Sequence, residues 1–164
     1  MNTFLRFQSP VGAILAVRTK NGISRIEIGA DAGFMDSAST TDLVLMQCRQ
    51  QLLEYLAGTR REFDVPLDWS AITGFQAEVL HMTLTIPYGE VRTYGELARA
   101  LGKPAASRAV GGALARNPLP ILIPCHRVVA ASGQLTGYSA ANGIATKAHL
   151  LELEGHRVVG QKLG

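Results

Sequence analysis

Residues 117–129 read Asn-Pro-Leu-Pro-Ile-Leu-Ile-Pro-Cys-His-Arg-Val-Val, and the chain is organised around this stretch. The apolar run at 121–123 is short, β-branched at both ends and flanked by prolines, a pattern that predicts a buried strand. Pro124 would end that strand, so that Cys125 and His126 follow it at once. Two chemically active side chains are therefore expected at a fixed point between stiff segments.

Cys125 and His126 are adjacent, as a cysteine nucleophile and its base can be. A free cysteine has a pKa of about 8.5, and only its thiolate form is a strong nucleophile. A neighbouring imidazole can take the thiol proton, and a carboxylate behind the imidazole can orient it. The same dipeptide also suits a buried structural cysteine beside a surface histidine, and adjacency alone leaves both interpretations open.

The motif Pro-Cys-His-Arg-Val-Val at 124–129, preceded by Asn117 and Pro118, resembles the signature of the O6-alkylguanine-DNA alkyltransferases, the methylated-DNA–protein-cysteine methyltransferases. Further stretches stand in the order of that family: Ile-Pro-Tyr-Gly-Glu-Val at 86–91, Tyr-Gly-Glu-Leu-Ala at 94–98, Arg-Ala-Val-Gly-Gly-Ala at 108–113, Gly-Tyr-Ser at 137–139, and the Leu-Leu pair at 150–151 followed by Glu-Gly at 154–155. The resemblance covers residues 74–157, and the first seventy residues match only weakly.

The resemblance implies an α+β protein of two domains. Residues 1–70 would form an N-terminal α/β domain, ribonuclease-H-like, with a small antiparallel sheet. Residues 74–157 would form a mostly helical, winged-helix-like domain that contains a helix-turn-helix and carries both DNA binding and alkyl transfer. From the sequence itself we expect residues 156–164 to be mobile, with a tail at 158–164.

The pattern of the first seventy residues itself predicts a small sheet and one helix. Alternating runs at 4–8, 12–18 and 22–28 are separated by turn residues, among them Asn21-Gly22, a strong hairpin signal. Asp42 is a candidate helix N-cap. The helix that follows has apolar residues at helical spacing, namely Leu45, Cys48, Leu52 and Leu56, so Cys48 is interpreted as a core residue.

Composition favours a soluble globular protein. The chain has 164 residues, of which 47% are hydrophobic and 18% charged, and it suits one large domain or two small ones. We expect a cytoplasmic protein, because no stretch approaches the roughly 20 apolar residues of a membrane span and the N-terminus lacks the apolar core of a signal peptide. Two cysteines without paired spacing indicate a reducing compartment, and they predict neither a disulfide nor a metal site.

Positive charge is concentrated in the second half of the chain. Residues 1–73 carry seven Lys or Arg against eight Asp or Glu, a net −1, whereas residues 74–164 carry nine against five, a net +4. This half also predicts two short helices, at 94–101 and 105–115, joined by Gly102-Lys103-Pro104 in a helix-turn-helix pattern. An ordinary pair of helices packed within a core would give the same sequence pattern. A basic half fits a phosphate-binding face.

The second helix of this pair carries almost only small side chains, with one long cation, Arg108. Reading bases in the major groove requires Arg, Asn or Gln at several positions. Small side chains instead let the backbone approach DNA closely and carry little sequence information. We therefore predict binding to double-stranded DNA with little sequence preference. The resemblance implies that this helix binds in the minor groove, with Arg108 filling the space of an extruded base. The alternative role for Arg108 is a surface ion pair. The residues placed against DNA are Ala106, Ser107, Arg108, Ala109 and Gly111.

The resemblance implies a reaction as well: a single-turnover transfer of an alkyl group, such as methyl, from O6 of guanine or O4 of thymine to Cys125, without a cofactor. His126 would take the thiol proton through a water, and Glu154 would orient His126 and favour its protonated form. Glu152 and Glu154 point to nearly opposite sides of a helix, because 3.6 residues make a turn. The carboxylate of the family is the one before the glycine, which is Glu154.

The resemblance also assigns a pocket around the nucleophile. Tyr94 would donate a hydrogen bond or proton to the base, Lys147 would lower the pKa of the thiol, and Asn117 would brace the turn before the cysteine. The expected pocket residues are Tyr138, Ser139, Lys147, Val128 and Leu114. Seven residues, 140–146, separate Ser139 from Lys147 where the family has five, which leaves the range of alkyl groups open.

Three other functions fit parts of the sequence. A non-catalytic protein that binds alkylguanine lesions would lack the nucleophile, whereas Cys125 is present. A Cys-His-Glu hydrolase would use the same triad for acyl transfer, but it would leave the helix-turn-helix unexplained. A winged-helix transcription factor is disfavoured by the bare second helix. We expect the protein to act as a monomer on DNA, without a membrane partner.

Overall fold

The computed structural model describes residues 2–29, 40–138, 140 and 142–164. The chain divides into two compact units, the first formed by Met1–Ala71 and Pro118–Leu122, the second by Ile72–Asn117 and Ile123–Gly164. The first unit contains a three-stranded antiparallel sheet and one helix, and the second is mostly helical. The expected α+β class is confirmed.

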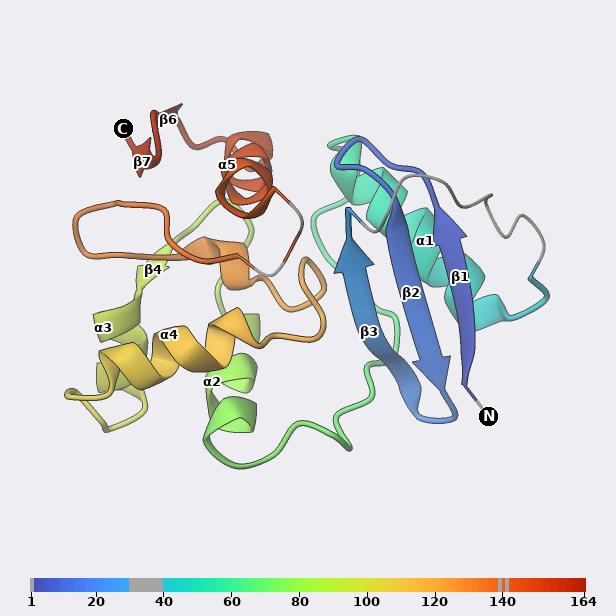
Figure 1. The fold of residues 1–164 in the computed structure, drawn as a ribbon, viewed down its shortest axis with the longest axis horizontal. Helices are drawn as coiled ribbons and strands as arrows, with labels where there is room; N and C mark the ends of the chain where they lie inside the picture. The colour runs from blue at the N-terminus through green and yellow to red at the C-terminus, as the bar shows by residue number, and fades with distance from the viewer. Residues whose placement is uncertain (1, 30–39, 139, 141) are drawn as a thin grey trace. The chain divides into compact units, whose positions relative to one another are not determined.

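The first unit is built on the strand order β1-β2-β3 (Figure 1). Its strands are β1 (Thr3–Phe7), β2 (Ile14–Thr19) and β3 (Gly22–Ile28), and its helix is α1 (Leu43–Leu56). The second hairpin requires glycine at its turn, because Gly22 has a φ of +138° and a Cβ there would lie 2.5 Å from the carbonyl oxygen of Pro66. Asp42 caps α1 as predicted, since its side chain accepts from the backbone N–H of Val44 and Leu45.

The strand expected at residues 121–123 is wrong. Ile121 and Leu122 form a turn and Ile123 is a single bridge residue; Ile121 has a φ of 71°, a left-handed conformation that is rare for a β-branched residue. All three side chains are buried. The apolar pattern therefore indicated burial correctly, but it did not indicate the backbone conformation. Pro118, just before this turn, accepts a hydrogen bond from the N–H of Ile26 at 2.8 Å.

The second unit brings its first three helices together (Figure 1). These are α2 (Gly74–Leu84), α3 (Tyr94–Ala100) and α4 (Ser107–Ala115), and the last two form the expected helix-turn-helix pair. Strand β4 (Arg92–Thr93) pairs in parallel with β5 (Val128–Val129). Because α3 begins directly after β4, through a capping box between Thr93 and Glu96, Tyr94 is held at a fixed helix start.

The mobile tail expected at 158–164 is also wrong. Strands β6 (Val158–Val159) and β7 (Lys162–Leu163) form an antiparallel hairpin that follows α5 (Gly143–Leu153). Val158 and Leu163 pack against a buried cluster of Val129, Leu135 and Leu151. A two-residue strand is too short to produce an alternating pattern, so the sequence alone did not reveal it. In the described part of the chain, none of the helices has the length and apolar character needed to cross a membrane.

Candidate active site

Cys125 begins a short 3₁₀ turn, η1 (Cys125–Arg127), directly after Pro124, and its side chain is buried. Burial raises the pKa of the thiol, while a hydrogen bond from the Asn117 side chain and the positive charge of Lys147 act to lower it. The Asn117 amide also donates to the carbonyl oxygen of Ile123 at 3.0 Å, within the turn that precedes the nucleophile. Asn117 thus contacts both the turn and the thiol that follows it.

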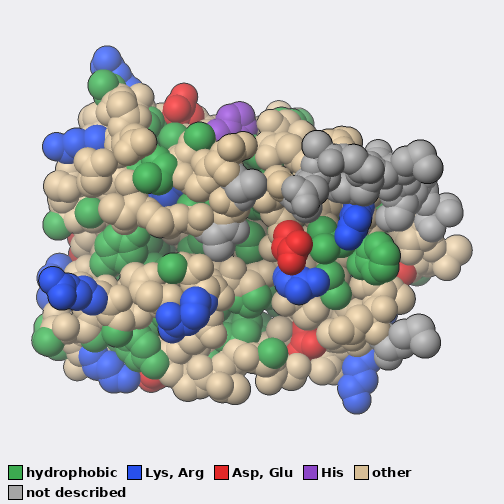
Figure 2. All heavy atoms as spheres, in the orientation of Figure 1, with side chains coloured by type: hydrophobic (Ala, Val, Ile, Leu, Met, Phe, Trp, Pro, Cys, Tyr) green, Lys and Arg blue, Asp and Glu red, His purple; other side chains and the backbone are tan. Residues whose placement is uncertain are grey.

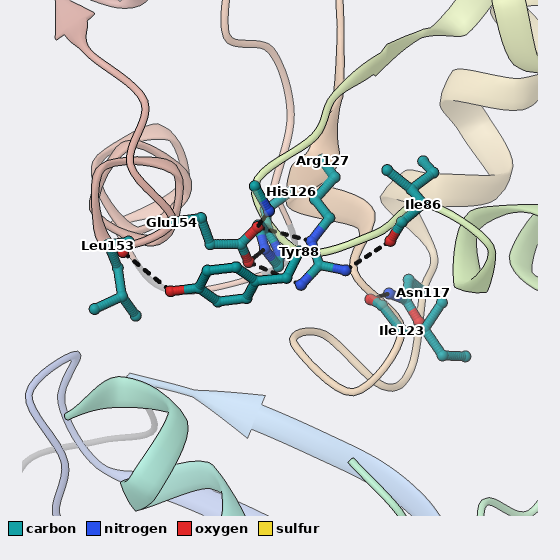
Figure 3. Close-up of polar contacts among 9 residues, drawn as sticks. Ile86, Tyr88, Asn117, Ile123, His126, Arg127, Leu153 and Glu154 are labelled. Atoms are coloured by element: carbon teal, nitrogen blue, oxygen red, sulfur yellow. Dashed lines mark hydrogen bonds and ion pairs between the residues drawn. The ribbon is translucent and has the colours of Figure 1, made fainter. Parts of the chain in front are cut away.

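Glu154 is the acceptor on which the neighbouring side chains of η1 converge (Figure 3). Its Oε2 lies 2.7 Å from His126 Nε2. Arg127 donates from Nε to Oε1 at 2.8 Å and from Nη2 to Oε2 at 3.0 Å. The N–H of Gly89 donates to Oε1 at 3.1 Å. Glu154 is buried at the C-terminal end of α5, whereas Glu152 is exposed.

Arg127 completes this network from a buried position; from the motif at 124–129 it was expected only as a structural residue. Its Nη1 donates to the carbonyl oxygen of Ile86 at 2.7 Å. Its guanidinium carbon lies 5.7 Å from the centre of the Tyr88 ring, and the Tyr88 hydroxyl donates to the carbonyl oxygen of Leu153 at 3.2 Å. The signal that could have found it is its place beside His126 in the motif at 124–129.

His126 is held in its neutral form. Burial lowers its pKa, and this effect exceeds the opposing influence of Glu154; the charges of Arg127 and Lys147 lower the pKa further. Glu154 does favour the protonated form, as expected, but burial outweighs it and the imidazole stays neutral. A neutral imidazole that donates from Nε2 to Glu154 has Nδ1 as its basic nitrogen.

Lys147 and Tyr94 meet at Thr136, a residue that the sequence patterns missed. Lys147 Nζ donates to the carbonyl oxygens of Val128 and Thr136, at 2.6 and 3.0 Å. Burial lowers the pKa of Lys147 to about 8, against an opposing effect of Cys125. The Tyr94 hydroxyl lies 2.8 Å from Thr136 Oγ1, and burial raises the pKa of Tyr94, so its hydroxyl stays protonated.

A cavity of about 430 Å³ connects Cys125 with the start of α4. It is lined by Tyr94, Ser107, Arg108, Gly111, Leu114, Ala115, Cys125, Ala130, Thr136 and Gly137. The cavity therefore joins Cys125 to the helix that carries Arg108, within one structural unit.

The expected pocket wall is only partly correct. Leu114 lines the cavity, whereas Val128 and Lys147 are buried and joined to each other by the hydrogen bond at 2.6 Å, outside the lining. Among the described residues, Tyr138 does not line the cavity either; Thr136 and Gly137 take that place. Ser139 lies outside the described residues.

Helix α4 presents small residues and Arg108 near the cavity. Arg108 and Ala109 are exposed, Ala106 is the N-cap, and Gly111 lies against Tyr94, whose ring would be 3.8 Å from an added Cβ. Over α3, α4 and their connection, Lys and Arg (blue) predominate over Asp and Glu (red) on the face in Figure 2. Among the described residues, no cluster of three His, Cys, Asp or Glu side chains could hold a metal ion.

The chain matches two family models over most of its length. Residues 4–69 match the ribonuclease-like domain of 6-O-methylguanine DNA methyltransferase, and residues 74–156 match the DNA binding domain of the same family. A methylated-DNA–protein-cysteine methyltransferase of Methanosarcina acetivorans is 43% identical over 152 residues, which cover 91% of this chain and 96% of that protein. The constitutive enzyme of Bacillus subtilis is 38% identical, with coverage of 94% and 96%.

Solved structures agree with these matches. The O6-methylguanine methyltransferase of Mycobacterium tuberculosis superposes with a TM-score of 0.81 at 38% identity, covering 98% of this chain and 96% of that one. The structure of Mycobacterium tuberculosis OGT in complex with DNA gives a TM-score of 0.78 at 42% identity, with coverage of 91% and 90%.

Proposed function

The chain belongs to the 6-O-methylguanine DNA methyltransferase family, and from this membership we propose that it repairs DNA by moving a methyl group from O6 of guanine to Cys125. One observation carries the proposal: the Cys125 side chain lines a cavity that opens beside Arg108 on a basic helix pair. A cavity of about 430 Å³ lies within the range of roughly 300–1,000 Å³ typical of small-molecule sites. It can therefore receive a single base.

The substrate must leave the DNA stack before it can react. O6 of a paired guanine is inside the duplex, and rotating the nucleotide outward costs a few kcal/mol, less for a lesion that pairs badly. Arg108 is exposed at the edge of the cavity and can occupy the gap that the nucleotide leaves. The small residues of α4 allow close approach to the minor groove of double-stranded DNA with little sequence preference. We propose that one copy of the chain suffices.

Proton transfer prepares the nucleophile. The buried thiol has a raised pKa, so a base must take its proton when the substrate is in place. Neutral His126 is that base, acting through a water, and the resulting imidazolium is stabilised by Glu154. Arg127 orients the Glu154 carboxylate, because it donates two hydrogen bonds to it.

The transfer step then exchanges one bond for another. The sulfur of Cys125 attacks the methyl carbon in line with O6; the new S–C bond forms as the C–O6 bond breaks, and the electron pair stays on the guanine. Tyr94 lines the same cavity and remains protonated, so its hydroxyl can donate to the departing base. The thioether has no hydrolytic exit, so each molecule acts once.

Intact-protein mass spectrometry after incubation with a duplex containing O6-methylguanine tests the proposal. We expect one added methyl group, located on Cys125, with repaired DNA reaching a plateau at the protein concentration. Cys48 provides the matched control, because burial raises its pKa to about 12: Cys48→Ala should keep the transfer and Cys125→Ala should abolish it. Continued turnover beyond one equivalent would favour a hydrolase instead.

The alternative of a non-catalytic lesion-binding protein has no support. Its defining feature would be a replaced nucleophile, whereas this chain keeps Cys125 beside His126. Curated relatives over nearly the full length are named methyltransferases. We propose the cytoplasm as the site of action, because both cysteines are free and a reducing compartment keeps such thiols reactive.

A further inference from the structure

The C-terminal hairpin, residues 158–163, lies beyond residues 74–156, the part that matches the DNA binding domain of the family. It is nevertheless bonded to another part of the second unit. The N–H of Leu135 donates to the carbonyl oxygen of Gln161 at 2.8 Å, and the N–H of Leu163 donates to the carbonyl oxygen of Gly133 at 3.0 Å. Gln134 and Lys162 form an antiparallel bridge between these two bonds.

Side-chain packing reinforces these backbone bonds. Leu163 packs on the buried cluster that includes Leu135, and a Cβ on Gly133 would lie 3.6 Å from the Leu163 side chain. Leu135 itself is buried. The hairpin therefore holds residues 133–135 both by backbone hydrogen bonds and by apolar contact.

Residues 133–135 lead directly into the cavity wall. Thr136 and Gly137 follow them in the chain and line the cavity, although neither belongs to a helix or a strand. Thr136 also receives Lys147 Nζ on its carbonyl oxygen, and its side-chain oxygen lies 2.8 Å from the Tyr94 hydroxyl. The position of Thr136 thus decides where two polar groups of the site are held.

We propose that the C-terminal hairpin is a positioning element of the transfer site: it fixes residues 133–135, and through Thr136 it fixes the hydroxyl of Tyr94, which lines the cavity, and the Lys147 ammonium, which donates to Thr136. This inference rests on the proposed function. Catalytic groups lose effect steeply when displaced, since a shift of about 1 Å can cost roughly a hundredfold in rate. The hairpin contributes no cavity-lining residue itself.

Two variants test the proposal, one shortened and one of full length, alongside the parent. One ends after Arg157, which removes the hairpin. The other is Gly160→Val, which strains the hairpin turn without a steric clash, because Gly160 has a φ of +65° and no heavy atom within 4 Å of an added Cβ. Gly58→Val is the matched control: Gly58 has a φ of +80° and equal space, but it lies after α1 in the first unit.

Three quantities are measured for each protein: the transfer rate at saturating O6-methylguanine DNA, the Kd for that DNA, and the pH dependence of the rate. Both hairpin variants should lose roughly tenfold or more in maximal rate, with Kd changed less than about twofold, because α4 is untouched. Their pH dependence should also differ from that of the parent, since Lys147 loses a fixed acceptor. Gly58→Val should resemble the parent in all three.

The outcomes separate this inference from the proposed function. Absence of methyl transfer in the parent itself would overturn the proposed function. A parent that transfers normally, with hairpin variants that match it in rate and pH profile, would overturn the positioning role. Equal losses of maximal rate in Gly58→Val and Gly160→Val would also overturn it, because the effect would then be one of general stability.

Discussion

Glu154 Oε2 lies 2.7 Å from His126 Nε2, and both side chains are fully buried. A buried charge of this kind is costly unless other groups satisfy it. Arg127 and the N–H of Gly89 supply three further hydrogen bonds to the same carboxylate. One carboxylate therefore serves two basic side chains, and removing it affects both the chemistry and the fold.

Glu154→Gln should reduce both the transfer rate and the stability of the protein. The amide cannot stabilise the imidazolium that forms during proton transfer, and it leaves the buried Arg127 charge without its partner, which costs about 3–5 kcal/mol. Single-turnover kinetics and denaturant unfolding measure the two effects. Glu152→Gln is the control, because Glu152 is exposed on the same helix and should change stability by less than about 0.5 kcal/mol. A larger loss of rate in Glu152→Gln would refute the assignment.

Arg127→Met should move the acid limb of the rate–pH profile to higher pH. The Arg127 charge lowers the pKa of His126, so its removal raises that pKa, and the base becomes protonated earlier as the pH falls. In the parent this limb should lie below 6.5, the ordinary value for histidine. Arg127→Lys keeps the charge and should shift the limb less. An acid limb that stays unchanged in Arg127→Met would show that Arg127 has no electrostatic role.

The pKa of His126 also predicts a pH dependence of stability. Its folded-state pKa is lowered below 6.5 by burial, so the unfolded state binds this proton first as the pH falls. The free energy of unfolding should therefore decrease as the pH drops below 6.5, and this contribution should be fully present above that pH. Urea unfolding at pH 7 and pH 5 measures it, with His126→Gln as the comparison in which the decrease is smaller.

Lys147→Met should slow transfer more at pH 7 than at pH 9.5. Lys147 lowers the pKa of the Cys125 thiol only while it carries its charge, and its own pKa is about 8. Above that pH the parent loses the charge as well, so the ratio of the two rates should approach one. Lys20→Met, in the exposed part of the first unit, should show no such dependence. A constant ratio across this range would contradict an electrostatic role for Lys147.

Arg108→Ala should weaken both DNA binding and transfer, by roughly tenfold, because unstacking a base costs a few kcal/mol and the gap then stays empty. The loss should shrink when the methylated guanine stands opposite a base with which it pairs poorly, since less work is then needed. Fluorescence titration and single-turnover kinetics on the two duplexes measure this. Arg25→Ala, an exposed cation of β3, should change neither quantity. Equal losses on both duplexes would indicate a phosphate contact instead.

Local signals in the sequence were sufficient for much of the fold. Asp42 and the apolar spacing after it predicted α1, and Asn21-Gly22 predicted a hairpin. Contacts between distant residues could not be predicted this way. The acceptors of Arg127 are Ile86 and Glu154, which are far from it in the chain. The role of Thr136 likewise depends on its contacts with Tyr94 and Lys147, which are also distant in sequence. The strand predicted at 121–123 was wrong for another reason: Ile121 is buried with a positive φ that its β-branched side chain disfavours.

The turn that contains Ile121 has a consequence for any attempt to divide this protein. Residues 118–122 belong to the first unit, although they lie between α4 and the nucleophile of the second, so the chain crosses between the units after residues 71, 117 and 122. A fragment that begins at residue 72 would carry this apolar turn but would lack the rest of the first unit. Leu119 and Leu122, which are buried in the intact chain, would then lose the residues that pack with them. The two halves are therefore not interchangeable modules: recombination between residues 71 and 72 alone would leave the segment next to Cys125 without its native packing.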